Sequence, residues 1–486
     1  MTGPTSDDEL CFTPATDLAR LIRTRQLSPV EVTAAVLDRI ERVGSRLNCF
    51  VTVVAEQAMA AAKDAERRVV QTAAAELPAL HGIPVTVKDL EATAGVRTTF
   101  GSVRYADHVP ATSAPIWQRM HEAGAVLVGK TTTPEFGMHG ITESRLTGVT
   151  NNPWDLSRTT GGSSGGAAAA VAAGLAPLAT GSDGGGSIRV PASLCGAVGF
   201  KPTIGRIPFA TPDSGAYEAV TVTGPITRTV ADAALMFEVV AGELDHDAVS
   251  ILGPAPRASA ALHDATLRGL RVAYSPDLGC GPVDPETDRV VRAAVGVMAA
   301  EGGAEVEEVT IHLPDPYDYF VGWWGPHLLL ELALMAEDGI TLDDCPDAVR
   351  PLVERAASMS AVDFVRVQMV TRSQIYRAFA DVFARFDLLV WPTTPLPAFE
   401  HPGAAGGPLS IAGRPVREPA MENQRLTEAI SHAGCPAITV PAGFTHDGLP
   451  VGLQIAARRG ADIAVLRAAA AFEAIAPWAH RRPPLR

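Results

Sequence analysis

Residues 180–196 read TGSDGGGSIRVPASLCG, and this stretch decides how the rest of the chain is interpreted. Three consecutive glycines, Gly184–Gly186, stand directly before Ser187. A glycine within regular structure costs about 0.5–1 kcal/mol in backbone entropy, so a run of three needs a compensating role. One such role is a backbone that comes very close to a ligand and directs its N–H groups at it.

The composition is that of a globular protein, because 47% of the 486 residues are hydrophobic and 19% are charged. The formal net charge of −14 argues against a nucleic-acid partner, which would need a basic surface. The first residues lack the positive and apolar regions of a signal peptide. No run of about 18 apolar residues predicts a membrane span. We therefore expect a cytoplasmic protein without membrane association.

The six cysteines are scattered along the chain without CxxC or metal-ligand spacing. This pattern is typical of reduced thiols in a cytoplasmic protein. Histidine and carboxylate residues show no metal-ligand spacing either. The sequence therefore predicts no metal and no cofactor. We expect a small-molecule substrate as the partner and a monomer or homodimer as the oligomeric state.

Predicted helices and strands alternate along the chain. Helical patterns follow Ser28-Pro29 and cover residues 55–77, 114–123, 166–174, 284–301, 361–386 and 462–475. Short buried-strand patterns cover residues 83–87, 125–128, 175–180, 270–274 and 387–395, and two more strands precede the last helix. This alternation predicts an α/β fold with a mainly parallel or mixed sheet.

Residues 124–131, GAVLVGKT, fit the P-loop pattern of phosphate-binding proteins. A P-loop is a glycine-rich loop that follows a strand and leads into a helix. Here the four middle residues themselves form a strand pattern, and a helix precedes them. We interpret the segment as a buried strand that ends at Lys130.

Residues 161–165, GGSSG, fit the G-x-S-x-G elbow of α/β-hydrolases. That elbow needs a buried strand before it, whereas the preceding residues, TNNPWDLSRTT, are typical of a loop. His401, His432 and His446 lie downstream and could supply the histidine that such a site requires. The elbow remains an alternative interpretation.

The longer block from Gly161 to Thr203 carries a more specific signal. It contains GGSSGG followed by GSDGGGSIR, and it resembles the signature of the amidase signature family. The similarity extends to GIPVTVKD around Lys88, GKTTTPEFG at 129–137 and PAITVPAGFTHDGLPVGLQI near the C-terminus. The resemblance implies an α/β amidase-signature fold, a mixed central β-sheet covered by helices on both faces.

The resemblance also implies a Ser–cis-Ser–Lys triad that acts on amide bonds. Ser187 is then the nucleophile, Ser163 the bridging serine after a cis peptide bond, and Lys88 the base. Ser164 is the alternative bridge. The chemistry is consistent, because serine needs an adjacent base and burial at a strand end lowers the pKa of a lysine. A hydroxyl between them can donate and accept a proton at once.

In the family, backbone N–H groups before the nucleophile form the oxyanion hole, which here implies Gly184, Gly185, Gly186 and Ser187. Asp183 and Arg189 flank this loop with opposite charges, so we expect them to pair and hold it. Family members commonly have threonine where this chain has Gly184. We expect this glycine to enlarge the space beside the oxyanion hole or to loosen the loop.

The resemblance implies a hydrolase of amide-type C–N bonds that acts through an acyl-enzyme on Ser187. We expect hydrophobic or aryl amides as substrates, with carbamates (urethanes) and esters as further candidates. One alternative is a glutaminase-type subunit of a tRNA-dependent amidotransferase, although Val190 stands where such subunits typically have glutamine. An alternative of another class is a catalytically silent binding protein.

Two regions flank or interrupt the family match. We expect residues 1–70 to form a helical segment packed on the core and residues 71–486 to form the catalytic domain. Within it, residues 206–422 are the predicted substrate-specificity region. The aromatic segment Tyr319–Met335 is either a buried core helix or an apolar wall over the site. The predicted substrate-binding residues are Gly137, Met138, Phe209, Tyr217, Trp323 and Trp324.

Overall fold

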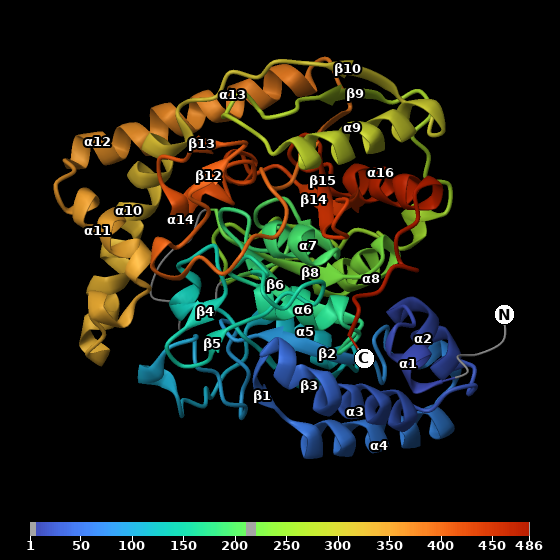
Figure 1. Ribbon diagram of the computed structural model, residues 1–486. Helices are drawn as coiled ribbons and strands as arrows, with labels where there is room; N and C mark the ends of the chain where they lie inside the picture. The colour runs from blue at the N-terminus through green and yellow to red at the C-terminus, as the bar shows by residue number, and fades with distance from the viewer. Residues whose placement is uncertain (1–5, 210–219, 486) are drawn as a thin grey trace.

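The computed structural model describes residues 6–209 and 220–485 (Figure 1). A mixed β-sheet of 11 strands runs through the centre of the molecule. In spatial order the strands are β1 (Phe50–Val53), β3 (Val126–Thr131), β2 (Pro84–Lys88), β6 (Leu178–Asp183), β8 (Val222–Thr227), β7 (Val198–Lys201), β14 (Ala437–Phe444), β15 (Pro450–Ala456), β11 (Leu388–Pro392), β9 (Arg271–Tyr274) and β10 (Glu305–Glu308).

Parallel and antiparallel pairs occupy different parts of this sheet. The strands β3, β2 and β6 are parallel, and so are β11, β9 and β10. Between them, β6, β8, β7, β14, β15 and β11 pair antiparallel. The sheet is therefore mixed rather than mainly parallel. Every residue of β2, β3 and β6 is buried, as expected for strands covered on both faces.

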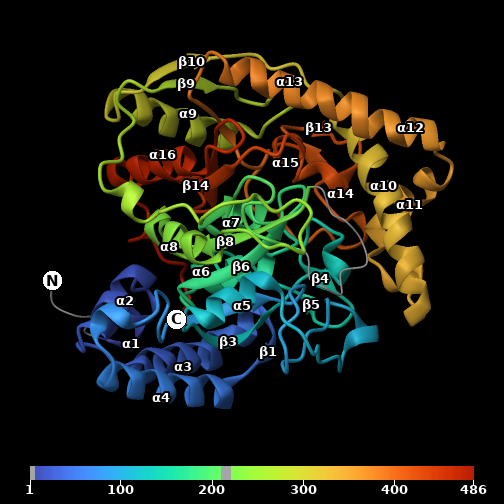
Figure 2. The same ribbon diagram turned by 180° about the vertical axis from the view of Figure 1, so that it is seen from behind.

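Helices cover both faces of the sheet, as expected (Figure 2). Successive residues of β6 enter different cores, because side chains alternate along a strand. Leu178 belongs to the large core and Ala179 to a smaller alanine-rich one. The large core includes α3 (Pro29–Leu47), α8 (Val230–Val240), α9 (Pro285–Ala300) and α16 (Asp462–Ile475), and the smaller one α6 (Gly165–Ala172) and α7 (Arg189–Cys195).

Local signals place the start of α3 as predicted, whereas two other predicted helices differ from the structure. Ser28 caps α3 and forms a capping box with Glu31, and proline occupies the first turn. α4 (Ala55–Gln71) ends before the predicted Leu77, because the chain becomes extended at Thr72. The predicted helix 361–386 consists of α12 (Ala361–Arg366), a π-helical turn at 367–371 and α13 (Arg372–Phe383).

A group of helices lies to one side of the central sheet and the helices that cover it, at the left in Figure 1 and at the right in Figure 2. It comprises α10 (Pro316–Met335), α11 (Arg350–Ala357) and α12, and it lies beside α14 (Pro419–Glu422). The remaining α-helices in the described part of the chain are α1 (Asp7–Cys11), α2 (Ala15–Arg23), α5 (Pro115–Glu122) and α15 (Glu428–His432). Across residues 6–209 and 220–485, no helix is both long and apolar enough to cross a membrane.

The N-terminal helices are joined to the core by a buried carboxylate. α2 begins after Pro14, which supplies no side-chain cap. Asp232 of α8 accepts hydrogen bonds from the backbone N–H groups of Ala15 at 3.0 Å and Thr16 at 2.9 Å. This carboxylate therefore caps α2 from a distant part of the chain. The predicted division into residues 1–70 and 71–486 stays a prediction.

We expect Asp232→Ala to lower the free energy of unfolding by about 2–3 kcal/mol, because it leaves buried N–H groups without an acceptor. Thermal unfolding measures the change. The control is Asp17→Ala, which removes an exposed ion pair with Arg20 and should cost less than about 1 kcal/mol. Equal shifts for the two variants would contradict the capping role.

Candidate active site

Lys88 ends β2 as a fully buried side chain surrounded by hydroxyl groups. Its Nζ lies 2.7 Å from Ser163 Oγ and 2.8 Å from Ser182 Oγ. Its backbone N–H donates to Thr180 Oγ1 at 2.9 Å. Because β2 and β6 are parallel neighbours, the end of β2 meets the end of β6, from which Thr180 and Ser182 come.

Burial lowers the pKa of Lys88 from its ordinary value of 10.5, because the charged amine loses its solvation. The negative charges of Glu91 and Asp183 oppose this shift without cancelling it. A neutral amine at hydrogen-bond distance from a serine hydroxyl can accept a proton. The strand end therefore holds a group with the properties of a general base.

Ser163 lies in the turn that leads into α6, after a cis peptide bond between Gly162 and Ser163. A Cβ at Gly162 would lie 2.8 Å from the backbone of Ile141, so a larger residue has no space there. Ser164 is buried and its Oγ lies 3.4 Å from the Ser182 carbonyl oxygen. The hydroxyl closest to Lys88 from this pair of serines is thus that of Ser163.

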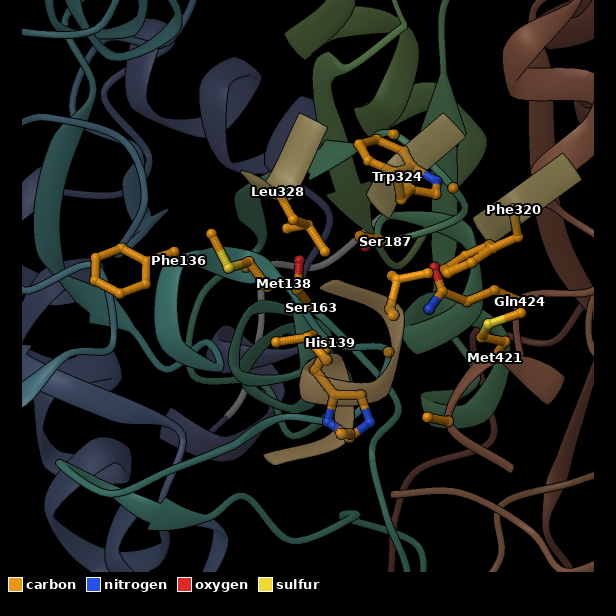
Figure 3. A pocket seen from close by; sticks show the side chains of 18 of the residues that line it. Phe136, Met138, His139, Ser163, Ser187, Phe320, Trp324, Leu328, Met421 and Gln424 are labelled. Atoms are coloured by element: carbon orange, nitrogen blue, oxygen red, sulfur yellow. The ribbon is translucent and has the colours of Figure 1, made fainter. Parts of the chain in front are cut away.

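Ser187 follows the glycine run, between the end of β6 and the start of α7. Its carbonyl accepts a hydrogen bond from Ser164 N–H at 3.2 Å, which joins the loop to the start of α6. Ser163 and Ser187 both line one cavity, together with Gly184 and Gly185 (Figure 3). Gly186 is not among the described residues that line it. The structure therefore brings both predicted serines to one surface.

Each glycine of the run contacts a specific side chain. A Cβ at Gly184 would lie 2.7 Å from Trp324 Cη2, one at Gly185 2.1 Å from Glu428 Oε2, and one at Gly186 2.0 Å from Thr427 Oγ1. Only Gly186 of the three also has a positive φ, at 136°. The Trp324 indole fills the space that Gly184 was expected to open, so that part of the expectation is wrong, while a looser loop stays a prediction.

Asp183 and Arg189 form the expected ion pair, and both side chains are fully buried. Arg189 Nε donates to Asp183 Oδ2 at 2.9 Å and Nη2 donates to Oδ1 at 2.8 Å. Although burial alone would raise the pKa of Asp183, the Arg189 guanidinium holds it below its ordinary value. Asp183 also accepts from the Ile188 N–H at 3.2 Å. The pair joins the two ends of the glycine loop.

A group of buried charges behind Lys88 was not predicted from the sequence. Thr180 Oγ1 donates to Glu91 Oε2, while Oε1 has no hydrogen-bond partner within the described residues. Burial raises the pKa of Glu91. Lys130 donates to the Glu91 carbonyl and, at 2.8 Å, to Thr93 Oγ1. The sequence signal that could have indicated this group is KDLE (88–91), which places three charged residues at the end of a buried strand. The prediction that Lys130 belongs to a buried strand is confirmed.

The cavity has a volume of about 530 Å³ and is lined mostly by apolar side chains. Of the predicted substrate-binding residues, Gly137, Met138, Phe209 and Trp324 line it. Tyr217 lies outside the described residues. Trp323 does not line the cavity: its indole is 2% exposed and lies 4.7 Å, between ring centroids, from His432 in the core.

Both interpretations of the aromatic segment hold, for different faces of α10. Phe320, Trp324 and Leu328 recur every four residues and line the cavity. Tyr319 and Trp323 precede them by one position and belong to a core cluster. The helix is thus a wall of the cavity and part of the core at the same time.

The α/β-hydrolase elbow lacks its required context. Between β5 (Gly148–Val149) and residues 161–165, the described backbone forms isolated β-bridges, Asn151 with Thr159 and Arg158 with Glu400, and no strand. His401, His432 and His446 do not line the cavity. Among residues 6–209 and 220–485, no group of three or more His, Cys, Asp or Glu side chains could hold a metal ion.

Comparisons with known proteins agree with this geometry. The family model described as Amidase matches residues 31–466. An acylamidase of Rhodococcus erythropolis is 40% identical over 484 residues, covering 98% of both chains. A subunit of the glutamyl-tRNA(Gln) amidotransferase of Moorella thermoacetica is 37% identical over 510 residues, covering 98% of this chain and 99% of that protein.

A solved structure of a bacterial aryl acylamidase of the amidase signature family superimposes with a TM-score of 0.90. It is 32% identical, and the match covers 96% of this chain and 97% of that one. The 11-stranded sheet and its helices are therefore those of an established enzyme fold. The chain belongs to the amidase signature family and is an amide-hydrolysing enzyme.

Proposed function

We propose that this enzyme hydrolyses hydrophobic or aryl amides through an acyl-enzyme on Ser187, with Ser163 and Lys88 completing a triad. The observation that carries the proposal is the buried Lys88 Nζ at 2.7 Å from Ser163 Oγ, with Ser163 and Ser187 on one cavity wall. The family membership supports it, since members use a Ser–cis-Ser–Lys triad.

In the proposed mechanism, Ser187 Oγ attacks the amide carbonyl and passes its proton to Ser163, whose own proton moves to Lys88. The tetrahedral oxyanion is stabilised by backbone N–H groups at Gly184–Ser187. Collapse breaks the C–N bond, and the amine leaves with the proton returned from Lys88 through Ser163. Water then attacks the acyl-enzyme, which releases the carboxylic acid and restores Ser187.

The side chains around the cavity support an apolar substrate. Phe136, Met138, Phe320, Trp324 and Leu328 surround it, and such a wall favours neutral, flat or hydrophobic groups. The acylamidase relative supports the same class. Carbamates and esters share the carbonyl and the oxyanion intermediate, so we include them as slower or alternative substrates. The specificity region at 206–422 is supported by the lining residues from α10 and α14.

A second candidate is a component of a tRNA-dependent amidotransferase, which the relative from Moorella thermoacetica favours. Val190, where such proteins typically have glutamine, speaks against it. Glutaminase activity and a copurifying partner protein would support this role. For the hydrolase we propose a cytoplasmic location, which the six unpaired thiols support, and a monomer or homodimer.

We expect Ser187→Ala to fold normally and to lose about 10⁴-fold or more of kcat, because the nucleophile is removed. Ser163→Ala and Lys88→Ala should each lose about 10³-fold or more, since proton transfer fails. Release of 4-nitroaniline from 4-nitroacetanilide measures the rates. Ser164→Ala is the matched control, and we expect it to keep most of the activity. A Ser187→Ala enzyme with more than about a tenth of the normal rate would overturn the assignment.

The value of kcat/KM should rise with pH to an alkaline plateau. Protonated Lys88 cannot accept a proton, so activity requires the neutral amine. Burial lowers the pKa of Lys88 from 10.5 to about 7, so the neutral amine accumulates as the pH rises above about 7. Steady-state kinetics across pH measure this profile. Lys88→Arg keeps the positive charge but does not deprotonate, so it should be inactive at every pH. A rate maximum at acidic pH would contradict a lysine base.

Aryl amides should be cleaved faster than small charged amides, because the cavity wall is apolar. The measurement compares kcat/KM for a 4-nitroanilide, an aryl carbamate and glutamine. We expect the anilide to exceed glutamine by about tenfold or more. A tenfold preference for glutamine would instead favour the amidotransferase role.

A further inference from the structure

The indole of Trp324 lies directly over the loop that precedes the nucleophile. A Cβ at Gly184 would lie 2.7 Å from Trp324 Cη2, 2.9 Å from Thr221 Oγ1 and 3.0 Å from Trp324 Cζ2, so the indole and this hydroxyl occupy the position of a side chain. The φ of Gly184 is not in the left-handed region, so an alanine would meet no backbone strain there. The glycine is therefore required by these neighbouring side chains, the indole nearest among them, and not by the backbone.

A buried carboxylate holds the indole N–H, which lies on the same long edge of the ring as Cζ2 and Cη2. Trp324 Nε1 donates to Glu428 Oε1 at 2.6 Å, and His432 Nε2 donates to the same oxygen at 2.7 Å. The Tyr319 hydroxyl lies 2.6 Å from His432 Nδ1. Glu428 is 3% exposed, so these contacts are shielded from water. A ring whose N–H is held by a buried hydrogen bond and whose Cζ2 and Cη2 atoms lie against a glycine has one preferred orientation.

Trp324 is also partly exposed, and it lines the cavity together with Gly184, Gly185 and Ser187. Figure 3 shows the Trp324 side chain at the border of the cavity that Ser187 also lines. A fixed aromatic face at this place can pack against a flat ring of the substrate. Such aromatic pairs contribute about 0.5–1.5 kcal/mol beyond the area that they bury.

We propose that Trp324 is a specificity-determining residue that selects a planar aromatic group next to the scissile amide, and that Gly184 and Glu428 are the residues that position it. This inference rests on the proposed hydrolase function. It assigns roles to three residues outside the triad, and it makes the absence of a side chain at 184 part of the substrate preference. The ring can be attached to the amide nitrogen or to the carbonyl carbon.

Three substrates separate these cases. 4-Nitroacetanilide carries its ring on nitrogen, benzamide carries it on the carbonyl carbon, and acetamide has none. Trp324→Leu should lower kcat/KM for at least one aromatic substrate about tenfold relative to acetamide. The substrate that responds identifies the side of the amide that the indole contacts. Equal losses for all three substrates would overturn the proposal.

A double-mutant cycle tests the contact between Gly184 and Trp324. Gly184→Ala alone should also lower the aromatic-to-acetamide ratio about tenfold, because the new methyl group displaces the indole. Combined with Trp324→Leu it should add little, since the shorter side chain vacates that space. Effects that multiply would overturn the coupling. Phe209→Ala is the control: it lines the same cavity from outside the helix that carries Trp324, and its effect should multiply with that of Gly184→Ala.

Glu428 is tested by a conservative and a disruptive variant. Glu428→Gln keeps an oxygen that can accept from the indole N–H, and it should keep the substrate ratio within about threefold of normal. Glu428→Leu removes the acceptor and should lower the ratio as Trp324→Leu does, with the larger change in KM. Equal ratios for the two Glu428 variants would overturn the positioning role.

Two controls distinguish a loss of substrate preference from a loss of folding and from a failure of the proposed hydrolase function. Thermal unfolding checks that each variant is folded, and stoichiometric labelling of Ser187 with a fluorophosphonate counts intact sites. A wild-type enzyme that hydrolyses none of the three substrates and is not labelled overturns the proposed function and this inference with it. A labelled, active enzyme in which the cycle is multiplicative overturns this inference alone.

Discussion

The removal of the Lys88 amine from water is the constraint on which the rest of the site depends. A solvated lysine at neutral pH is a cation and cannot take a proton from serine. The chain achieves the burial by ending β2 beside β6, so that the amine contacts the hydroxyls of Ser163 and Ser182 and is shielded from solvent. Because these partners come from different segments, the site requires the sheet to be formed.

A buried amine also demands that the surrounding charges be balanced. Glu91 and Asp183 act on Lys88 through the low-dielectric interior, and each has its own cationic neighbour. Asp183 accepts two hydrogen bonds from Arg189, so its negative charge is balanced mainly by this guanidinium at the glycine loop. Lys130 bonds the backbone of Glu91. Asp183 and Arg189 thus form a direct ion pair under the catalytic surface, while Lys88 and Lys130 act on the Glu91 carboxylate without an ion-pair contact.

The sequence predicted those features that local chemistry or a long motif determines. Ser28 and Pro29 start α3, Asp462–Ile475 is α16, and Lys88 ends a buried strand, all as predicted. It did not predict the contact of Gly184 with Trp324, because the two residues are joined only by the tertiary fold. The assignment of Trp323 to the cavity failed for a related reason. Adjacent residues on a helix point in directions about 100° apart, and sequence hydrophobicity alone does not fix which one faces the core.

The two faces of α10 have a practical consequence for engineering this enzyme. Positions 320, 324 and 328 border the cavity, while 319 and 323 belong to the interior. A combinatorial library at positions 320 and 324 varies partly exposed residues of the cavity wall, whereas changes at 319, 323 and 328 also remove buried packing.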